Sequence, residues 1–302
     1  MLFFAGLLPA ALSGCAGPQR PPKQRARAID LDRKGAEFFH QGQYAKALSF
    51  FQKSLLVNES IDNREGVALS LNNVGTVYQS TGEYVRALEC YQRALTINSE
   101  IDSPEGQSLN LNNIGSVTLS LGKPRAALEF FQKSLTLEEK KGETRAQAVR
   151  WNNMGLAYRA LGQDDRALEC YLQAKKLNEK SEHFGGIADN LNNIGALYES
   201  QKDYSRALEA FQGALAADKK IENSVGISTD LANLGRLFET KGEREKALDY
   251  YLRAWRVNEY LGFKERILQD LAKIAPLYEA LGKFEEAEKV RQRARELASS
   301  PK

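Results

Sequence analysis

Apolar and small residues recur in this chain with a helical spacing inside a longer repeat of forty residues. In the second repeat, one face of a first segment is formed by residues at i, i+3, i+4 and i+7: Leu71, Val74, Gly75 and Tyr78. After Gly82, a second segment carries one apolar stripe: Tyr84, Ala87, Leu88, Tyr91, Ala94 and Leu95. The run Asp102-Ser103-Pro104 ends it, because proline disfavours helical geometry in the preceding residue. Each repeat therefore predicts two helices joined by a turn.

Three columns of residues keep the forty-residue spacing along the chain. They are Gly35, Gly75, Gly115, Gly155, Gly195 and Gly235; then Ala47, Ala87, Ala127, Ala167, Ala207, Ala247 and Ala287; then Phe51, Tyr91, Phe131, Tyr171, Phe211 and Tyr251. One helix pair cannot bury its apolar face alone, so such repeats gain stability by stacking. The sequence predicts an all-α solenoid of about seven helix-turn-helix units, at residues 28–64, 65–104, 105–144, 145–184, 185–224, 225–264 and 265–298.

The small residues have a steric role in this prediction. Gly75 and Ala87 fall where the two helices of a unit cross, and a larger side chain there would push the helix axes apart. We expect the large residues Tyr78 and Tyr91 to fill the space between neighbouring units.

The fourth unit carries the most specific motif, Trp151-Asn152-Asn153-Met154-Gly155-Leu156-Ala157-Tyr158, followed by Ala167 and Tyr171. This motif resembles the tetratricopeptide repeat (TPR), which usually has 34 residues. The forty-residue form is similar to the repeats of kinesin light chain, of Leu-Gly-Asn proteins and of bacterial Rap regulators. The resemblance implies a right-handed superhelix that binds an extended peptide or a partner protein on its concave face.

Asparagine, a mediocre helix former, occupies two neighbouring registers of the first helices. The first register holds Asn72, Asn112, Asn152 and Asn192, and the second holds Asn73, Asn113, Asn153, Asn193 and Asn233. A carboxamide can both donate to and accept from a peptide backbone. The resemblance implies this peptide-binding role for the second register, and we add Arg236, one turn along the same face. The alternative is that these asparagines bond to neighbouring helices and stiffen the stack.

A row of glutamates continues along this face at Glu199, Glu239 and Glu279. It offers an acidic margin to a partly basic peptide, or else it is only a solvated helix face.

The first residues predict a targeting segment. The apolar run of residues 2–12 is shorter than the roughly 20 residues needed to span a bilayer as a helix. Leu12-Ser13-Gly14-Cys15 resembles the lipobox of bacterial lipoproteins. The resemblance implies a signal peptide at 1–14, a lipid on Cys15, a Pro-rich basic tether at 15–27 and attachment to the periplasmic face of the outer membrane. The chain departs from that pattern because no basic residue precedes Arg20.

Two alternatives remain open for this segment. It could be an ordinary apolar terminus packed on the first repeat, with Cys15 a plain thiol. In that case the chain could be a cytosolic, Rap-like regulator that senses a small peptide or sequesters a partner protein.

Composition narrows the class of function. The apolar share of 42% and the charged share of 27% are typical of globular proteins, and a net charge of +3 gives no indication of nucleic-acid binding. Three cysteines and two histidines leave little material for disulfides or a metal site. No phosphate loop, dinucleotide motif or nucleophile elbow occurs. We therefore expect a protein-binding scaffold, not an enzyme, with no cofactor, metal or small-molecule substrate.

Overall fold

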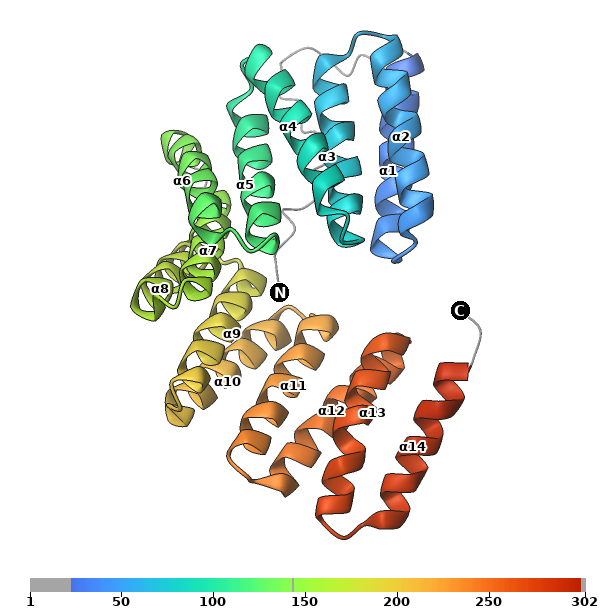
Figure 1. The fold of residues 1–302 in the computed structure, drawn as a ribbon, viewed down its shortest axis with the longest axis vertical. Coiled ribbons are helices and arrows are strands. Elements are labelled where there is room, and N and C mark those ends of the chain that lie inside the picture. The colour runs from blue at the N-terminus through green and yellow to red at the C-terminus, as the bar shows by residue number, and fades with distance from the viewer. Residues whose placement is uncertain (1–22, 143, 300–302) are drawn as a thin grey trace. The chain divides into compact units, whose positions relative to one another are not determined.

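The computed structural model describes residues 23–142 and 144–299, all of which form helices or the short turns between them. The fourteen helices of these described residues are α1 Lys23–His40, α2 Tyr44–Ser60, α3 Arg64–Ser80, α4 Tyr84–Glu100, α5 Pro104–Ser120, α6 Pro124–Lys141, α7 Thr144–Ala160, α8 Asp164–Lys180, α9 Phe184–Ser200, α10 Tyr204–Lys220, α11 Ser224–Thr240, α12 Arg244–Leu261, α13 Lys264–Ala280 and α14 Phe284–Ser299. They follow one another as helix-turn-helix pairs (Figure 1), which confirms the all-α solenoid fold. The right-handed superhelix stays a prediction.

The N-terminal helix begins earlier than the sequence indicates. Residues 23–27, which we assign to the tether, form the first turns of α1. Cys15 and the predicted signal peptide at 1–14 lie outside the described residues. Among the described helices, none combines the length and the apolar character that crossing a membrane requires.

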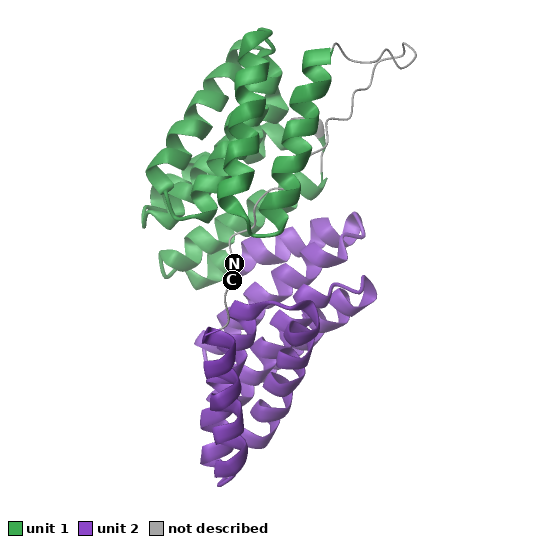
Figure 2. Cartoon of the chain, turned by 90° about the vertical axis from the view of Figure 1, so that its right-hand side faces the viewer, with its two compact units in different colours: residues 1–167 green, residues 168–302 purple. Residues whose placement is uncertain are grey.

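The chain divides into two compact units, residues 1–167 and residues 168–302 (Figure 2). Within each unit, successive helices pack against one another: α1 to α7 in the first and α9 to α14 in the second. The first unit holds the asparagines of α3, α5 and α7, and the second unit holds those of α9 and α11.

The turns inside the pairs depend on one left-handed residue. Gly82 has φ +80°, and glycine holds the equivalent place in most of the repeats. Lys202 takes that place in the fifth repeat with φ +62°. A left-handed residue after a helix lets the chain reverse at once, and glycine does so without a steric penalty.

The glycine column of the first helices is explained by an aromatic ring. A Cβ atom on Gly75 would lie 2.7 Å from Cε1 of Tyr91, and Gly35, Gly115, Gly195 and Gly235 face the ring of their own pair in the same way. Ala87 is fully buried, which fits the close approach predicted for it. Tyr91 therefore covers Gly75 of its own pair, and it also packs against Ile114 and Val117 of the next.

This packing can be tested within one helix. In α9, a Cβ on Gly195 would lie 2.7 Å from the ring of Phe211, whereas a Cβ on Gly185 would meet no atom closer than 3.7 Å. Overpacking of a tight core costs about 1–3 kcal/mol. We expect Gly195→Ala to lower the free energy of unfolding by that amount in a urea titration. Gly185→Ala is the matched control and should be neutral or slightly stabilising, since alanine favours helices. Equal effects of the two substitutions would contradict the ring-contact explanation.

Candidate functional site: polar columns between the repeats

In the first unit, the second-register asparagines point into the stack. Asn73, Asn113 and Asn153 have 2%, 6% and 0% of their surface exposed. Nδ2 of Asn113 donates to Oδ1 of Asn72 at 2.8 Å, and Nδ2 of Asn153 donates to Oδ1 of Asn112 at 2.8 Å. Each bond joins a first helix to the first helix of the preceding repeat. The two registers therefore bond to each other across the repeat boundary.

The first repeat keeps this pattern with a carboxylate. Asp32 stands forty residues before Asn72 and is hydrogen-bonded to Asn73. The hydroxyl of Ser54 donates to Oδ2 of Asp32 at 2.7 Å. Burial raises the pKa of Asp32 to about 6. The hydrogen bonds to Ser54 and Asn73 favour the ionised form and oppose this shift. The series of hydrogen bonds between successive first helices, called here the asparagine ladder, thus begins at α1.

In the second unit, the same bond recurs closer to the surface. Nδ2 of Asn233 on α11 donates to Oδ1 of Asn192 on α9 at 2.9 Å. Asn193, Asn233 and Arg236 are each half-buried, and 42% of the Arg236 side chain is exposed. Arg236 pairs with Glu199 and also donates to Oδ1 of Asn233 at 3.4 Å.

The glutamate row is bonded to the stack. Besides the Glu199 pair, the hydroxyl of Tyr251 donates to Glu239 at 2.9 Å, and Arg291 pairs with Glu279 at 2.6 Å. Arg291 occupies the place of the aromatic column in the last repeat. These glutamates are therefore paired with side chains of the protein and do not form an unpaired acidic surface.

These contacts are the ones expected if the asparagines stiffen the stack. The amide nitrogens of Asn113, Asn153 and Asn233 all donate within the protein. The peptide-binding role of Asn73, Asn113, Asn153, Asn193, Asn233 and Arg236 stays a prediction. The second unit presents the more accessible members of this set.

A further polar column lies on the second helices and was missed in the sequence. Asn98 on α4 donates to Asn110 on α5 at 2.7 Å, and Asn178 on α8 donates to Asn190 on α9 at 2.8 Å. The same pair of positions, twelve residues apart, recurs as Asn58–Ser70, Glu138–Arg150, Asp218–Asp230 and Asn258–Asp270. We call these pairs the joint pairs, because each joins a second helix to the following first helix.

A second glycine column makes room for the joint pairs. A Cβ atom on Gly106 would collide with the carboxamide of Asn98, and a Cβ atom on Gly66, Gly186 or Gly226 would collide with Asn58, Asn178 or Asp218 in the same way. The signal in the sequence is this coincidence: a polar residue at the end of a second helix, and a glycine eight residues later.

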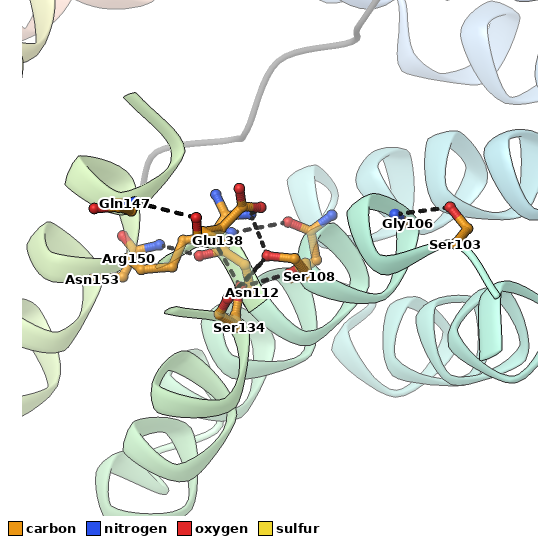
Figure 3. A network of polar contacts seen from close by, with 10 residues as sticks. Ser103, Gly106, Ser108, Asn112, Ser134, Glu138, Gln147, Arg150 and Asn153 are labelled. Atoms are coloured by element: carbon orange, nitrogen blue, oxygen red, sulfur yellow. Dashed lines mark hydrogen bonds and ion pairs between the residues drawn. The ribbon is translucent and has the colours of Figure 1, made fainter. Parts of the chain in front are cut away.

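The joint pair between α6 and α7 is a buried ion pair (Figure 3). Arg150 lies 3.3 Å from Glu138, and both side chains are at most 6% exposed. The guanidinium also donates to the hydroxyls of Ser134 at 2.9 Å and Ser108 at 3.2 Å. A buried charge is tolerated only when it is paired and hydrogen-bonded. This contact between α6 and α7 therefore requires opposite charges on the two helices.

The thiols of the described residues show no sign of activation. Cys170 is buried and Cys90 half-buried, and neither forms a disulfide. Burial raises the pKa of Cys170 to about 12 and raises that of Cys90 as well. Because the thiolate is the nucleophile, this shift disfavours the reactive form of both cysteines at neutral pH. No group of three or more potential metal-ligating side chains occurs within residues 23–142 and 144–299.

Several solved structures share the fold. A Rap protein complexed with Competence and Sporulation Factor has 16% identity and a TM-score of 0.66, over 90% of this chain and 75% of that chain. Aspartyl phosphate phosphatase F from Bacillus subtilis has 14% identity and a TM-score of 0.68, over 92% and 71%. A kinesin light chain repeat protein from Podospora anserina has 16% identity and a TM-score of 0.52, over 66% and 99%. At these identities the similarity establishes the fold alone.

The family is established by the sequence itself. No curated protein matches the chain. The model of the tetratricopeptide repeat family matches residues 28–100, 107–180 and 186–259, which together make up well over half of the chain. With its consecutive helix pairs, its glycine–ring contacts and its bonded polar columns, this chain belongs to the tetratricopeptide repeat family.

Proposed function

We propose that the protein is a non-catalytic scaffold that binds an extended peptide, or an extended segment of a partner protein, on the face formed by its first helices. Family membership supports a role in protein interaction. A similar fold is seen in a Rap protein complexed with Competence and Sporulation Factor. The observation that carries the proposal is the row of half-buried polar side chains on α9 and α11: Asn193, Asn233 and Arg236.

The second unit is the better candidate for the contact. In the first unit, Asn73, Asn113 and Asn153 are buried. In the second, Arg236 keeps 42% of its side chain exposed and can turn from Glu199 to a peptide carbonyl or carboxylate. Three hydrogen bonds at about 0.5–1.5 kcal/mol each supply about 1.5–4.5 kcal/mol. A micromolar affinity needs about 8 kcal/mol, so side-chain contacts must supply the remainder and the specificity.

We also propose that a lipid on Cys15 holds the scaffold at the periplasmic face of a bacterial outer membrane. The support is Leu12-Ser13-Gly14-Cys15 after an apolar run of signal-peptide length. Acyl chains contribute about 0.8 kcal/mol per buried methylene, so several chains anchor firmly. The second candidate is a cytosolic regulator that senses a small peptide or sequesters a partner protein, and its support is the similar fold of a Rap protein complexed with Competence and Sporulation Factor.

Peptide binding can be tested without knowing the partner. Dodecapeptides selected from a random display library on the full chain should bind it with micromolar Kd in fluorescence anisotropy. We expect Arg236→Ala combined with Asn193→Ala to weaken them at least tenfold, a loss of about 1.4 kcal/mol. The matched control is Arg244→Ala, an exposed arginine on the second helix α12. Unchanged affinity in a double variant with native circular dichroism would refute this binding face.

The anchor has a separate test. Cells expressing the chain are labelled with radioactive palmitate, and the protein is captured and washed in detergent. We expect label in the wild type and none in Cys15→Ala, since Cys15 is the only lipid-accepting residue that the motif provides. Cys90→Ala serves as the control and should keep its label. A wild-type chain without label would leave the cytosolic regulator as the better account.

A further inference from the structure

In five of the six joint pairs, one partner donates a hydrogen bond to the other. In Asn98–Asn110 and Asn258–Asp270, an amide nitrogen of the second helix donates to an oxygen of the next first helix, at 2.7 Å and 2.6 Å. In Glu138–Arg150, the donor and the acceptor change sides. Each of these pairs therefore brings its own donor hydrogen into a buried site, where an unpaired polar atom is costly.

The pair between α10 and α11 lacks such a donor. Asp218 and Asp230 are both carboxylic acids, with 3% and 0% of their surface exposed. Oδ1 of Asp218 accepts from Asn223 at 2.9 Å, and Oδ1 of Asp230 accepts from Asn192 at 2.6 Å. Oδ2 of Asp230 is buried, and no amide or hydroxyl group of the described residues donates to it. A proton on one of the two acids would supply the missing donor hydrogen.

Among the described residues, no basic side chain is paired with Asp218 or Asp230. The helix α9 contributes Asn192 and a third acid, Asp189, whose pKa burial and the nearby Asp218 raise to about 7. Arg266 of α13 reaches α11, but it bonds to Val225, Ser228 and Thr229. A second ionised carboxylate would therefore face an uncompensated like charge.

The titration behaviour agrees with the geometry. Burial, and after it the neighbouring acid Asp218, raise the pKa of Asp230 to about 8, although the hydrogen bond from Asn192 opposes this shift. Burial also raises the pKa of Asp218, while its bonds to Asn223 and Asp230 oppose that shift. Two acids of this kind titrate as a pair.

We propose that Asp218 and Asp230 share one proton, and that this proton makes the contact between α10 and α11 a pH-sensitive joint. With the proton, the two carboxyl groups hydrogen-bond and close the joint. Without it, they repel each other across the helix boundary. Asp230 also bonds to Asn192, which accepts from Asn233. A pH response of the peptide face would rest on the proposed function, whereas the shared proton does not.

The sign of the effect follows from linkage. A buried acid with a folded-state pKa of about 8 keeps its proton in the folded chain at pH values where the unfolded chain, with a pKa near 3.9, has lost it. The joint therefore loses stability as the pH rises from about 4 to about 8. Between these values, one such proton changes the unfolding equilibrium constant about tenfold per pH unit.

The test follows the second unit alone. The chain has two tryptophans, so Trp151→Phe leaves Trp255 of α12 as the fluorescent reporter. In this background, urea unfolding is measured from pH 5 to pH 8.5. Asp218→Asn combined with Asp230→Asn recreates the chemistry of Asn98–Asn110. For each pH unit, the unfolding equilibrium constant of the parent should increase by a factor about ten times larger than the factor for the double variant. Asp249→Asn, an exposed acid on α12, is the control and should keep the parent's pH dependence.

An identical pH dependence in the parent and the double variant would overturn the proposal. Should the variant fail to fold, the full wild-type chain with ¹³C-labelled aspartate carboxyls provides the answer by NMR. We expect a carboxyl signal of the protonated form to persist above pH 7, and Asp218→Asn to shift its titration. Ionisation of every aspartate by pH 6 would be incompatible with a shared proton.

Discussion

Each helix pair of this chain buries polar side chains whose hydrogen-bond partners lie on the neighbouring pairs. The pairs must therefore stack for these side chains to be hydrogen-bonded. Asn113 finds its acceptor on Asn72 of the preceding repeat, and Asn98 finds its partner on Asn110 of the following one. Apolar burial alone would drive repeats together with little preference for register. Buried carboxamides add direction, because a shift of one residue would strand their donors and acceptors.

The same constraint accounts for two glycine columns with different partners. Gly75 leaves room for the ring of Tyr91, while Gly106 leaves room for the carboxamide of Asn98. Rings and amides thus approach the backbone of a neighbouring helix closely, and glycine at the contact position leaves room for them. The joint pairs then differ from repeat to repeat, as an amide pair, an ion pair or an acid pair. These differences give individual repeats properties that the common fold does not prescribe.

The periodic features were predictable from the sequence, and the individual contacts were not. The forty-residue spacing of Gly75, Ala87 and Tyr91 was sufficient to predict paired helices, because it fixes which faces meet. The direction of Asn73 was not predictable, since a carboxamide satisfies a peptide and a neighbouring asparagine equally well. The joint pairs escaped notice because their chemistry changes along the chain. The forty-residue register places Glu138 and Asp218 where Asn98 stands in another repeat, but only the geometry shows that each pairs with the residue twelve positions later.

The most direct test of this account measures the energy of one bond between repeats. A double-mutant cycle on Asn112 and Asn153, with each residue changed to alanine singly and then together, isolates their interaction from their separate roles. The account predicts a coupling energy of about 0.5–1.5 kcal/mol in urea unfolding. Strictly additive effects, with a coupling energy below about 0.3 kcal/mol, would show that the asparagine ladder does not hold the repeats together.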